Sequence, residues 1–166
     1  PDTAADYSNL FFVIKGAEPF FHWRSNQLEE YAALTNEQKL ARFPDIAAQS
    51  NLSTDEQLDL AAKALRQQSI DHFNATVGIS APDPHTLRIT LERPTAYFLD
   101  LAAFAPFAPV YPPLVENHVA LDPATGRIQQ GYAWTKPPLL VTNGPYTPTS
   151  WQFKRGMFLE RNPYFR

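Results

Sequence analysis

Apolar residues spaced three or four positions apart recur in the first half of the chain and predict helices. Two of these segments open with a capping-box signature, a serine or threonine followed three positions later by glutamine or glutamate. Thr35–Gln38 opens a short helix that we expect to end at Pro44, and Ser53–Glu56 opens a longer one over 54 to about 73. The apolar face of the longer helix consists of Leu58, Ala61, Ala62 and Leu65.

After Val77, the spacing of apolar residues changes from a repeat of 3.6 residues to a repeat of two. A repeat of two residues is typical of a β-strand. Leu87, Ile89 and Leu91 alternate with polar residues, so we predict a half-buried strand there. Together with residues 77–79, across a loop at 82–85 that holds two prolines, this strand predicts a hairpin. Other segments predict a short helix at 7–14, a buried helix at 95–104, extended chain at 105–113, a short helix at 114–119 and a surface loop at 122–131.

The last part of the chain predicts a second hairpin, with strands Tyr146–Phe153 and Met157–Tyr164 and a turn at 154–156. A two-stranded hairpin alone is marginally stable in water. We therefore expect it to pair with, or lie on, a larger structure. Helices in the first half and hairpins in the second predict an α+β fold.

Composition narrows the class of protein. The 166 residues, 44% of them hydrophobic, are enough for one domain with a core, and 16 prolines against six glycines predict rigid loops. A net charge of −3 argues against binding nucleic acid by bulk charge. The absence of cysteine from the sequence excludes disulfides and thiolate metal sites, and no apolar run is long enough to span a membrane.

Sequence motifs for catalysis are missing. The four histidines lack the i, i+4 spacing of a metal-binding helix, and no phosphate-binding glycine loop or nucleophile elbow occurs, so we expect no metal and no cofactor. One alternative class stays open, an aromatic-rich carbohydrate-binding module or a small hydrolase. It depends on four aromatic rings and two carboxylates, namely Tyr132, Trp134, Tyr146, Trp151, Glu116 and Asp122.

Three strings in order carry a family resemblance: DPHTLRITLERPTAYF at 83–98, TNGPYTPTSW at 142–151 and LERNPYF at 159–165. Together they resemble the peptide/nickel class of bacterial extracellular solute-binding proteins, the receptors of oligopeptide and dipeptide ABC transporters. The main departure from that class is a longer and more helical segment at about 20–74.

The resemblance implies that this chain is an internal fragment of a much longer receptor with a type II periplasmic-binding-protein-like fold. Residues 1–138 would form its second subdomain, a small mixed lobe with the helical insertion at about 20–74. Residues 139–166 would be return strands, a C-terminal β-hairpin belonging to the first domain, which is absent. The sequence begins without a start methionine or signal-peptide pattern, as an excised segment would.

The resemblance also implies a function. The full-length protein would lie in the periplasm or elsewhere outside the cytoplasm, with a lipid anchor on the absent N-terminus as one means of attachment. There it would deliver an oligopeptide or another small solute to an ABC permease without catalysis. Tyr7 falls where the family can place an aromatic ring toward the ligand, and packing under a helix is the alternative for that ring.

Two further groups of residues match the family's motifs and are expected to be structural. In the first, Asn143 can hydrogen-bond locally, Gly144 can adopt positive φ, and Tyr146 and Trp151 anchor the strand. In the second, Arg161 and Asn162 precede Pro163, which ends the strand ladder because it has no N–H to donate.

Overall fold

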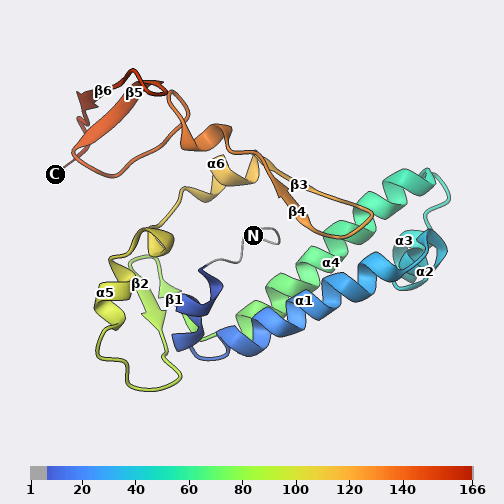
Figure 1. Cartoon of the computed structure of the whole chain (residues 1–166). Helices are drawn as coiled ribbons and strands as arrows, with labels where there is room; N and C mark the ends of the chain where they lie inside the picture. Colours follow the sequence, from blue (N-terminus) through green and yellow to red (C-terminus); the bar gives the residue numbers. More distant parts are fainter. Residues whose placement is uncertain (1–6, 166) are drawn as a thin grey trace. The chain divides into compact units, whose positions relative to one another are not determined.

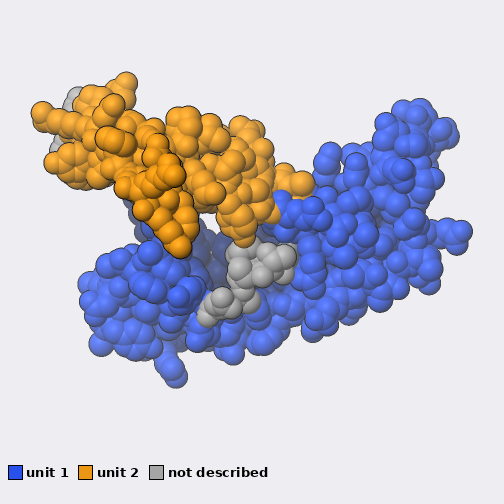
Figure 2. Space-filling view, turned by 45° about the horizontal axis from the view of Figure 1, so that its top comes forward, with its two compact units in different colours: residues 1–108, 121–129 blue, residues 109–120, 130–166 orange. Residues whose placement is uncertain are grey.

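A computed structural model of the chain describes residues 7–165, and these residues form parts of two compact units. Unit 1 comprises residues 1–108 and 121–129, and unit 2 comprises residues 109–120 and 130–166 (Figure 2). Both helices and two-stranded antiparallel sheets occur, which confirms the α+β class.

Helices dominate unit 1. The long helices α1 (Ala17–Ala33) and α4 (Thr54–Thr76) lie side by side, with the short helices α2 (Asn36–Ala41) and α3 (Pro44–Ala47) between them in sequence (Figure 1). Both predicted capping boxes are present, at the starts of α2 and α4. The segment at about 20–74 is therefore helical, as the sequence indicated.

The N-terminus of α4 shows why the sequence signature was reliable. The Ser53 N–H donates to Glu56 Oε2 at 2.8 Å, and the Glu56 N–H donates to Ser53 Oγ at 3.3 Å. These two bonds satisfy N–H groups that a helix start leaves without partners. Hydrogen bonds from the Ser53 N–H and hydroxyl stabilise the charged carboxylate and lower the pKa of Glu56.

The hydrophobic core of unit 1 lies among these helices. Leu65 and Ala61 from α4 are fully buried against Leu28 and Tyr31 of α1, and Phe43 closes the cluster. Burial raises the pKa of Tyr31, with Arg42 opposing the shift. The apolar face predicted for residues 54–73 is thus the face that packs.

A hairpin of β1 (Ile79–Asp83) and β2 (Thr86–Ile89) follows α4. Its register pairs Ile79 with Ile89, and the His85 N–H donates to Asp83 Oδ1 at 2.9 Å in the turn. The predicted hairpin is confirmed. The prediction of a half-buried strand is wrong for Leu87, whose side chain is 67% exposed because no described residue covers that part of the hairpin.

The next segment differs from prediction in two ways. The helix expected over 95–104 is shortened to α5 (Phe98–Ala102), and it is not buried, since Leu99 is 80% exposed. Part of the segment expected to be extended forms the 3-10 turn η2 (Ala105–Phe107).

Near the start of the chain, residues 7–14, expected to be helical, contain the 3-10 helix η1 (Ser8–Val13).

The strands β3 (Val119–Leu121) and β4 (Ile128–Gln130) pair with each other, and their connecting residues belong to unit 1. The Lys39 ammonium donates to the Ala124 carbonyl at 2.6 Å, and Gly126 is buried at φ +68°. The expectation of a surface loop at 122–131 is therefore wrong, because this segment packs on the helices.

Unit 2 begins with α6 (Pro112–Glu116), earlier in the chain than the short helix predicted at 114–119. It also contains the 3-10 turn η3 (Ala133–Thr135) and the strands β5 (Tyr146–Gln152) and β6 (Gly156–Arg161). The two strands pair antiparallel at the positions predicted for the second hairpin, and Lys154 adopts φ 60° in the turn.

Candidate functional site

An aromatic cavity lies within unit 1 and has a volume of about 720 Å³. Its walls come from η1, α1, the end of α4 and the start of β1, with additional residues from η2 and from the segment between β3 and β4. The lining includes Tyr7, Phe11, Phe12, Phe20, Phe21, Phe73, Arg24, Ser25 and Arg127. We call this space the aromatic cavity.

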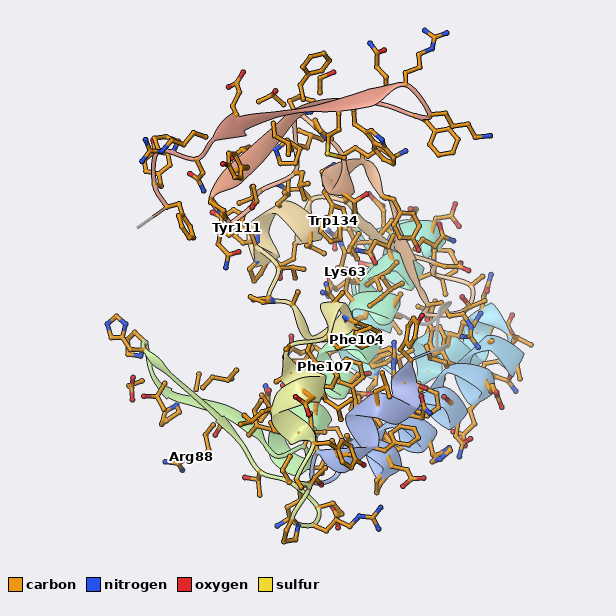
Figure 3. All side chains as sticks on the ribbon, turned by 60° about the vertical axis from the view of Figure 1, so that its left-hand side comes forward. Lys63, Arg88, Phe104, Phe107, Tyr111 and Trp134 are labelled. Atoms are coloured by element: carbon orange, nitrogen blue, oxygen red, sulfur yellow. The ribbon has the colours of Figure 1, made fainter. Side chains whose placement is uncertain are left out.

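Ring contacts hold η1 in place along one wall. Phe11 stacks on Phe107 with ring centroids 4.3 Å apart, and Tyr7 meets the edge of Phe104 at 5.8 Å. Phe104 and Phe107 lie close together in unit 1 (Figure 3). Such pairs contribute beyond the area that they bury, so they orient the wall as well as covering it.

The connection from η1 to α1 is fixed by backbone geometry. Gly16 adopts φ +74°, a left-handed conformation, and a Cβ at this position would lie 2.2 Å from the Thr76 carbonyl oxygen. The Lys15 N–H donates to the Thr90 carbonyl at 2.9 Å, and Ile14 forms a bridge with Leu91. The chain therefore turns sharply beside the end of α4 and places Phe20 and Phe21 on the cavity.

A polar network holds one of the two lining arginines. Arg24 Nη1 donates to Gln27 Oε1 at 2.7 Å, and Nη2 donates to the Gly126 carbonyl at 3.3 Å. Gln27 is only 6% exposed, and its Oε1 also accepts from Ser69 Oγ at 3.0 Å. Arg24 is thus positioned by a buried partner, and its bond to Gly126 brings it beside Arg127, the next residue in the chain.

The segment that supplies Arg127 is stabilised by Asp122. The Asp122 carboxylate accepts hydrogen bonds from the Thr125 hydroxyl at 2.7 Å and the Ala124 N–H at 2.9 Å. These bonds, the hydroxyl first, lower the pKa of Asp122. The carboxylate is occupied in holding this loop, which argues against the acid–base role considered for it.

The other carboxylate of the hydrolase alternative, Glu116, belongs to unit 2, whereas Asp122 belongs to unit 1. Of the aromatic rings in that alternative, Trp134 is half-buried, with its Nε1 buried and without a hydrogen-bond partner, while Tyr132 is exposed. Within residues 7–165, no group of three or more His, Asp or Glu side chains could hold a metal ion.

Tyr7, the residue expected to face ligand, lines the aromatic cavity and is 55% exposed. Sequence reasoning singled out Tyr7 alone and missed the phenylalanines and arginines around it. Phe20, Phe21 and Arg24 are close in sequence and could have been noticed as one turn of a helix. Nothing in the sequence indicated that Arg127, more than a hundred positions later, would join them.

The motif residues near the C-terminus form a compact hydrogen-bonded corner. Asn162 is 7% exposed, its Nδ2 donates to the Gly144 carbonyl at 2.8 Å, and its N–H donates to the Pro145 carbonyl at 2.8 Å. Asn162 Oδ1 accepts from the N–H of Tyr164, just beyond Pro163. Gly144 does not adopt the positive φ that glycine permits, and its N–H donates to Thr142 Oγ1 at 3.0 Å.

The β5–β6 hairpin has one apolar face. Met157, Leu159 and Arg161 alternate along β6 and so share a face. A register irregularity at Thr149 keeps their partners on β5 on that same face. Those partners are Trp151, Pro148 and Tyr146.

The apolar side chains of this face are exposed to solvent. Tyr146, Met157 and Leu159 are 58%, 52% and 54% exposed, and Trp151 is 45% exposed. An uncovered apolar sheet face of this kind marks a surface that packs against another structure or binds a ligand.

The sequence was compared with models of known families. Residues 28–166 match the model of bacterial extracellular solute-binding proteins, family 5 Middle. The chain belongs to this family. The match includes all three strings that carried the resemblance, so the resemblance is confirmed, whereas Tyr7 lies outside the matched residues.

Curated relatives agree with this family assignment. The periplasmic oligopeptide-binding protein OppA of Escherichia coli is 34% identical over 89 residues, which are 54% of this chain and 14% of OppA. The periplasmic murein peptide-binding protein MppA of E. coli is 37% identical over 70 residues, 42% of this chain and 11% of MppA. The probable deoxycholate-binding periplasmic protein YgiS of E. coli is 28% identical over 91 residues, 55% of this chain and 15% of YgiS.

These alignments therefore cover only a small part of each relative. No solved structure matches this family 5 chain. Among the residues described, no helix has both the length and the apolar character needed to cross a membrane.

Proposed function

We propose that this family 5 chain is an internal segment of an extracytoplasmic receptor that delivers oligopeptides or related small solutes to an ABC permease and has no catalytic activity. The observation that carries the proposal is the family match over residues 28–166. The names of OppA and MppA, which bind peptides, favour peptides as the solute class. The name of YgiS extends the class to other small molecules. The same relatives are named as periplasmic proteins, which supports the location in the periplasm that we propose, and attachment by a lipid anchor is part of the proposal.

Residues 1–138 belong, in this proposal, to the second subdomain, and residues 139–166 are return strands of the first domain. The open apolar face of the β5–β6 hairpin supports this boundary. Side chains such as Trp151 and Leu159 would be covered when the hairpin joins the larger sheet of the first domain. The boundary falls inside unit 2. Asn143, Gly144 and Tyr146 at the start of the hairpin, and Arg161, Asn162 and Pro163 at its end, then serve the structure and not the ligand.

Tyr7 is the residue of this chain that we propose to contact the peptide. Its ring is held at the edge of Phe104, while more than half of its surface stays open to a ligand. A tyrosine in this setting offers a rigid apolar ring with a hydroxyl that can hydrogen-bond.

Calorimetric titration of the full-length protein with tri-alanine tests the proposal. We expect saturable binding, no hydrolysis of the peptide, and a loss of about tenfold in affinity for Tyr7→Ala, the range typical of one interfacial aromatic contact. Tyr97→Ala is the matched control, because Tyr97 is 54% exposed in the same unit and does not line the cavity.

Two outcomes would count against parts of the proposal. Absence of binding to tri-alanine and to a panel of longer peptides would contradict the peptide class. Equal losses for Tyr7→Ala and Tyr97→Ala would show that Tyr7 only packs. The 166-residue segment by itself should bind peptide weakly or not at all, because the family's cleft needs a second domain to close on the ligand.

A further inference from the structure

The aromatic cavity and the proposed peptide contact share one residue, Tyr7. Its ring lines the cavity, is 55% exposed and lies against the edge of Phe104, with 5.8 Å between the ring centroids. A peptide bound against this ring therefore reaches the cavity. The preference of the receptor among peptides then depends on the other residues that line the same space.

Most of these residues are apolar. Phe12 and Phe21 lie 5.6 Å apart between ring centroids, and Phe20 meets the edge of Phe73 at 5.3 Å. All four side chains line the cavity and are half-buried, so each has apolar surface that the described residues leave open. An apolar group that covers this surface releases water from it, which favours binding.

The cavity offers no partner to a positively charged side chain. Among the described lining residues none is an aspartate or a glutamate, and the charged ones are Arg24 and Arg127. Both arginines have interaction partners within the protein, and those of Arg24 include Gln27 and the Gly126 carbonyl. Their role is to hold the wall. An ammonium group buried beside two guanidinium groups and without a carboxylate is disfavoured.

The size of the cavity suits a large guest. Its volume of about 720 Å³ lies within the roughly 300–1,000 Å³ of pockets that hold small organic ligands. An aromatic ring or a long alkyl chain has room to enter. The methyl group of an alanine would leave most of the apolar wall uncovered.

We propose that the aromatic cavity is a specificity pocket that takes one large apolar side chain of the bound peptide. The inference rests on the proposed function, because it needs a peptide held against Tyr7. It deepens that function by naming the class of peptide that the receptor prefers, which is a peptide with an aromatic or long alkyl residue.

A series of tripeptides of equal length tests the pocket: tri-alanine, Ala-Phe-Ala, Ala-norleucine-Ala and Ala-Lys-Ala. Norleucine and lysine both have straight alkyl chains, and only lysine is charged. In calorimetric titrations of the full-length protein, we expect Ala-Phe-Ala to bind about tenfold or more tightly than tri-alanine, because it buries one phenylalanine side chain. Ala-norleucine-Ala should also bind more tightly than tri-alanine, and Ala-Lys-Ala should not.

A variant that fills the cavity assigns this preference to it. Ser25 lines the cavity, so Ser25→Phe places a ring inside, and Ala-Phe-Ala and tri-alanine should then bind about equally. Ser80→Phe is the matched control. It adds the same ring at an exposed position of β1 outside the lining and should keep the preference for Ala-Phe-Ala.

A second variant removes part of the wall. Phe12→Ala should reduce the preference for Ala-Phe-Ala over tri-alanine several-fold, because less apolar surface remains for the guest to cover. Tyr97→Ala removes an exposed ring of the same unit outside the lining and should leave the preference as it is. Circular dichroism of each variant verifies that it is folded.

Several outcomes would overturn the inference. Equal affinities for all the tripeptides would refute the pocket and leave the proposed function intact, since peptide would still bind. An unchanged preference in both Ser25→Phe and Phe12→Ala would show that another part of the receptor fills the cavity. Equal loss of preference in Ser25→Phe and Ser80→Phe would show a general effect of an added ring. Absence of binding for every tripeptide would contradict the proposed function together with this inference.

Discussion

The helical part of unit 1 and the β5–β6 hairpin bury their apolar residues to very different degrees. Ala61, Ala62 and Leu65 of α4 have no exposed surface, whereas every residue of β6 is exposed. The helices complete a core within this chain, and the apolar face of the hairpin finds no cover among residues 7–165. Under the proposed function, the open apolar face of the hairpin is the surface that would pack against the first domain.

Truncation of a large apolar side chain in each region tests this contrast most strongly. In the isolated segment, Leu65→Ala should lower the free energy of unfolding by about 2–5 kcal/mol, because it leaves a cavity in the core. Leu159→Ala on the exposed hairpin should change it by about 0.5 kcal/mol or less. Urea denaturation followed by circular dichroism measures both.

The same pair of variants in the full-length protein sharpens the comparison. If the hairpin packs into the first domain as proposed, Leu159→Ala should there cost about 2 kcal/mol or more. An equally small effect in both proteins would contradict the assignment of residues 139–166 to the first domain.

Glycine substitutions should have the next largest effect on the free energy of unfolding. Gly16→Ala should destabilise unit 1 by about 1–3 kcal/mol from the left-handed backbone alone, and contact with the Thr76 carbonyl adds to that cost. Gly156→Ala in the hairpin is the control, since a Cβ there meets no atom within 4 Å and φ is not positive. Thermal unfolding should show a clear loss for the first variant, and a comparable loss for Gly156→Ala would contradict this explanation.

Loss of the cap on α4 should have a smaller effect. Ser53→Ala removes the hydroxyl that accepts from the Glu56 N–H and should cost about 1 kcal/mol. Ser150→Ala on β5 is the matched control in the hairpin, where the side chain caps no helix, and it should be nearly neutral. Chemical denaturation of both variants measures the free energy of unfolding. Equal losses for Ser53→Ala and Ser150→Ala would show that the cap makes no specific contribution to stability.

The smallest expected effect is a dependence on pH. The pKa of Glu56 is lowered in the folded state from its ordinary value of 4.5, so its carboxylate favours folding above that value. This contribution should disappear as the pH falls through the lowered pKa. Glu56→Gln can still form a capping box, as Gln38 does in α2, and should reduce the pH dependence between pH 6 and 3 while keeping stability at pH 7. An unchanged slope in stability measurements would contradict the assignment.

Local signals were predictable from the sequence. The capping boxes at Thr35 and Ser53 act within four residues, and the turn of the first hairpin depends on neighbours of Asp83. The helix α1 was not delimited, because its N-cap is Gly16 in a left-handed conformation and not a serine, threonine, aspartate or asparagine. Only the folded chain brings Gly16 beside Thr76, where a Cβ would not fit. Burial was overestimated at Leu87 and Leu99, where an apolar residue lies in a regular element that nothing described covers.

The aromatic cavity was the least predictable feature. Tyr7 was identified only through the family resemblance, and Arg127 reaches the cavity because Lys39 and Arg24 bind the carbonyls of Ala124 and Gly126. Contacts between residues about a hundred positions apart leave no periodic pattern in the chain.

By itself, the sequence determined the starts of α2 and α4, the approximate strand positions of the C-terminal hairpin and, through three ordered strings, the family. Those properties depend on interactions between neighbours or on matches to a motif. The buried face of α4 was predictable as well, whereas the tertiary structure alone decided whether the apolar residues of the two hairpins and of α5 are covered. The irregularity at Thr149 places Tyr146 and Trp151, five positions apart and otherwise on opposite faces, on one apolar face. Burial depends on what lies across a face, and for the core of unit 1 that partner is distant in sequence.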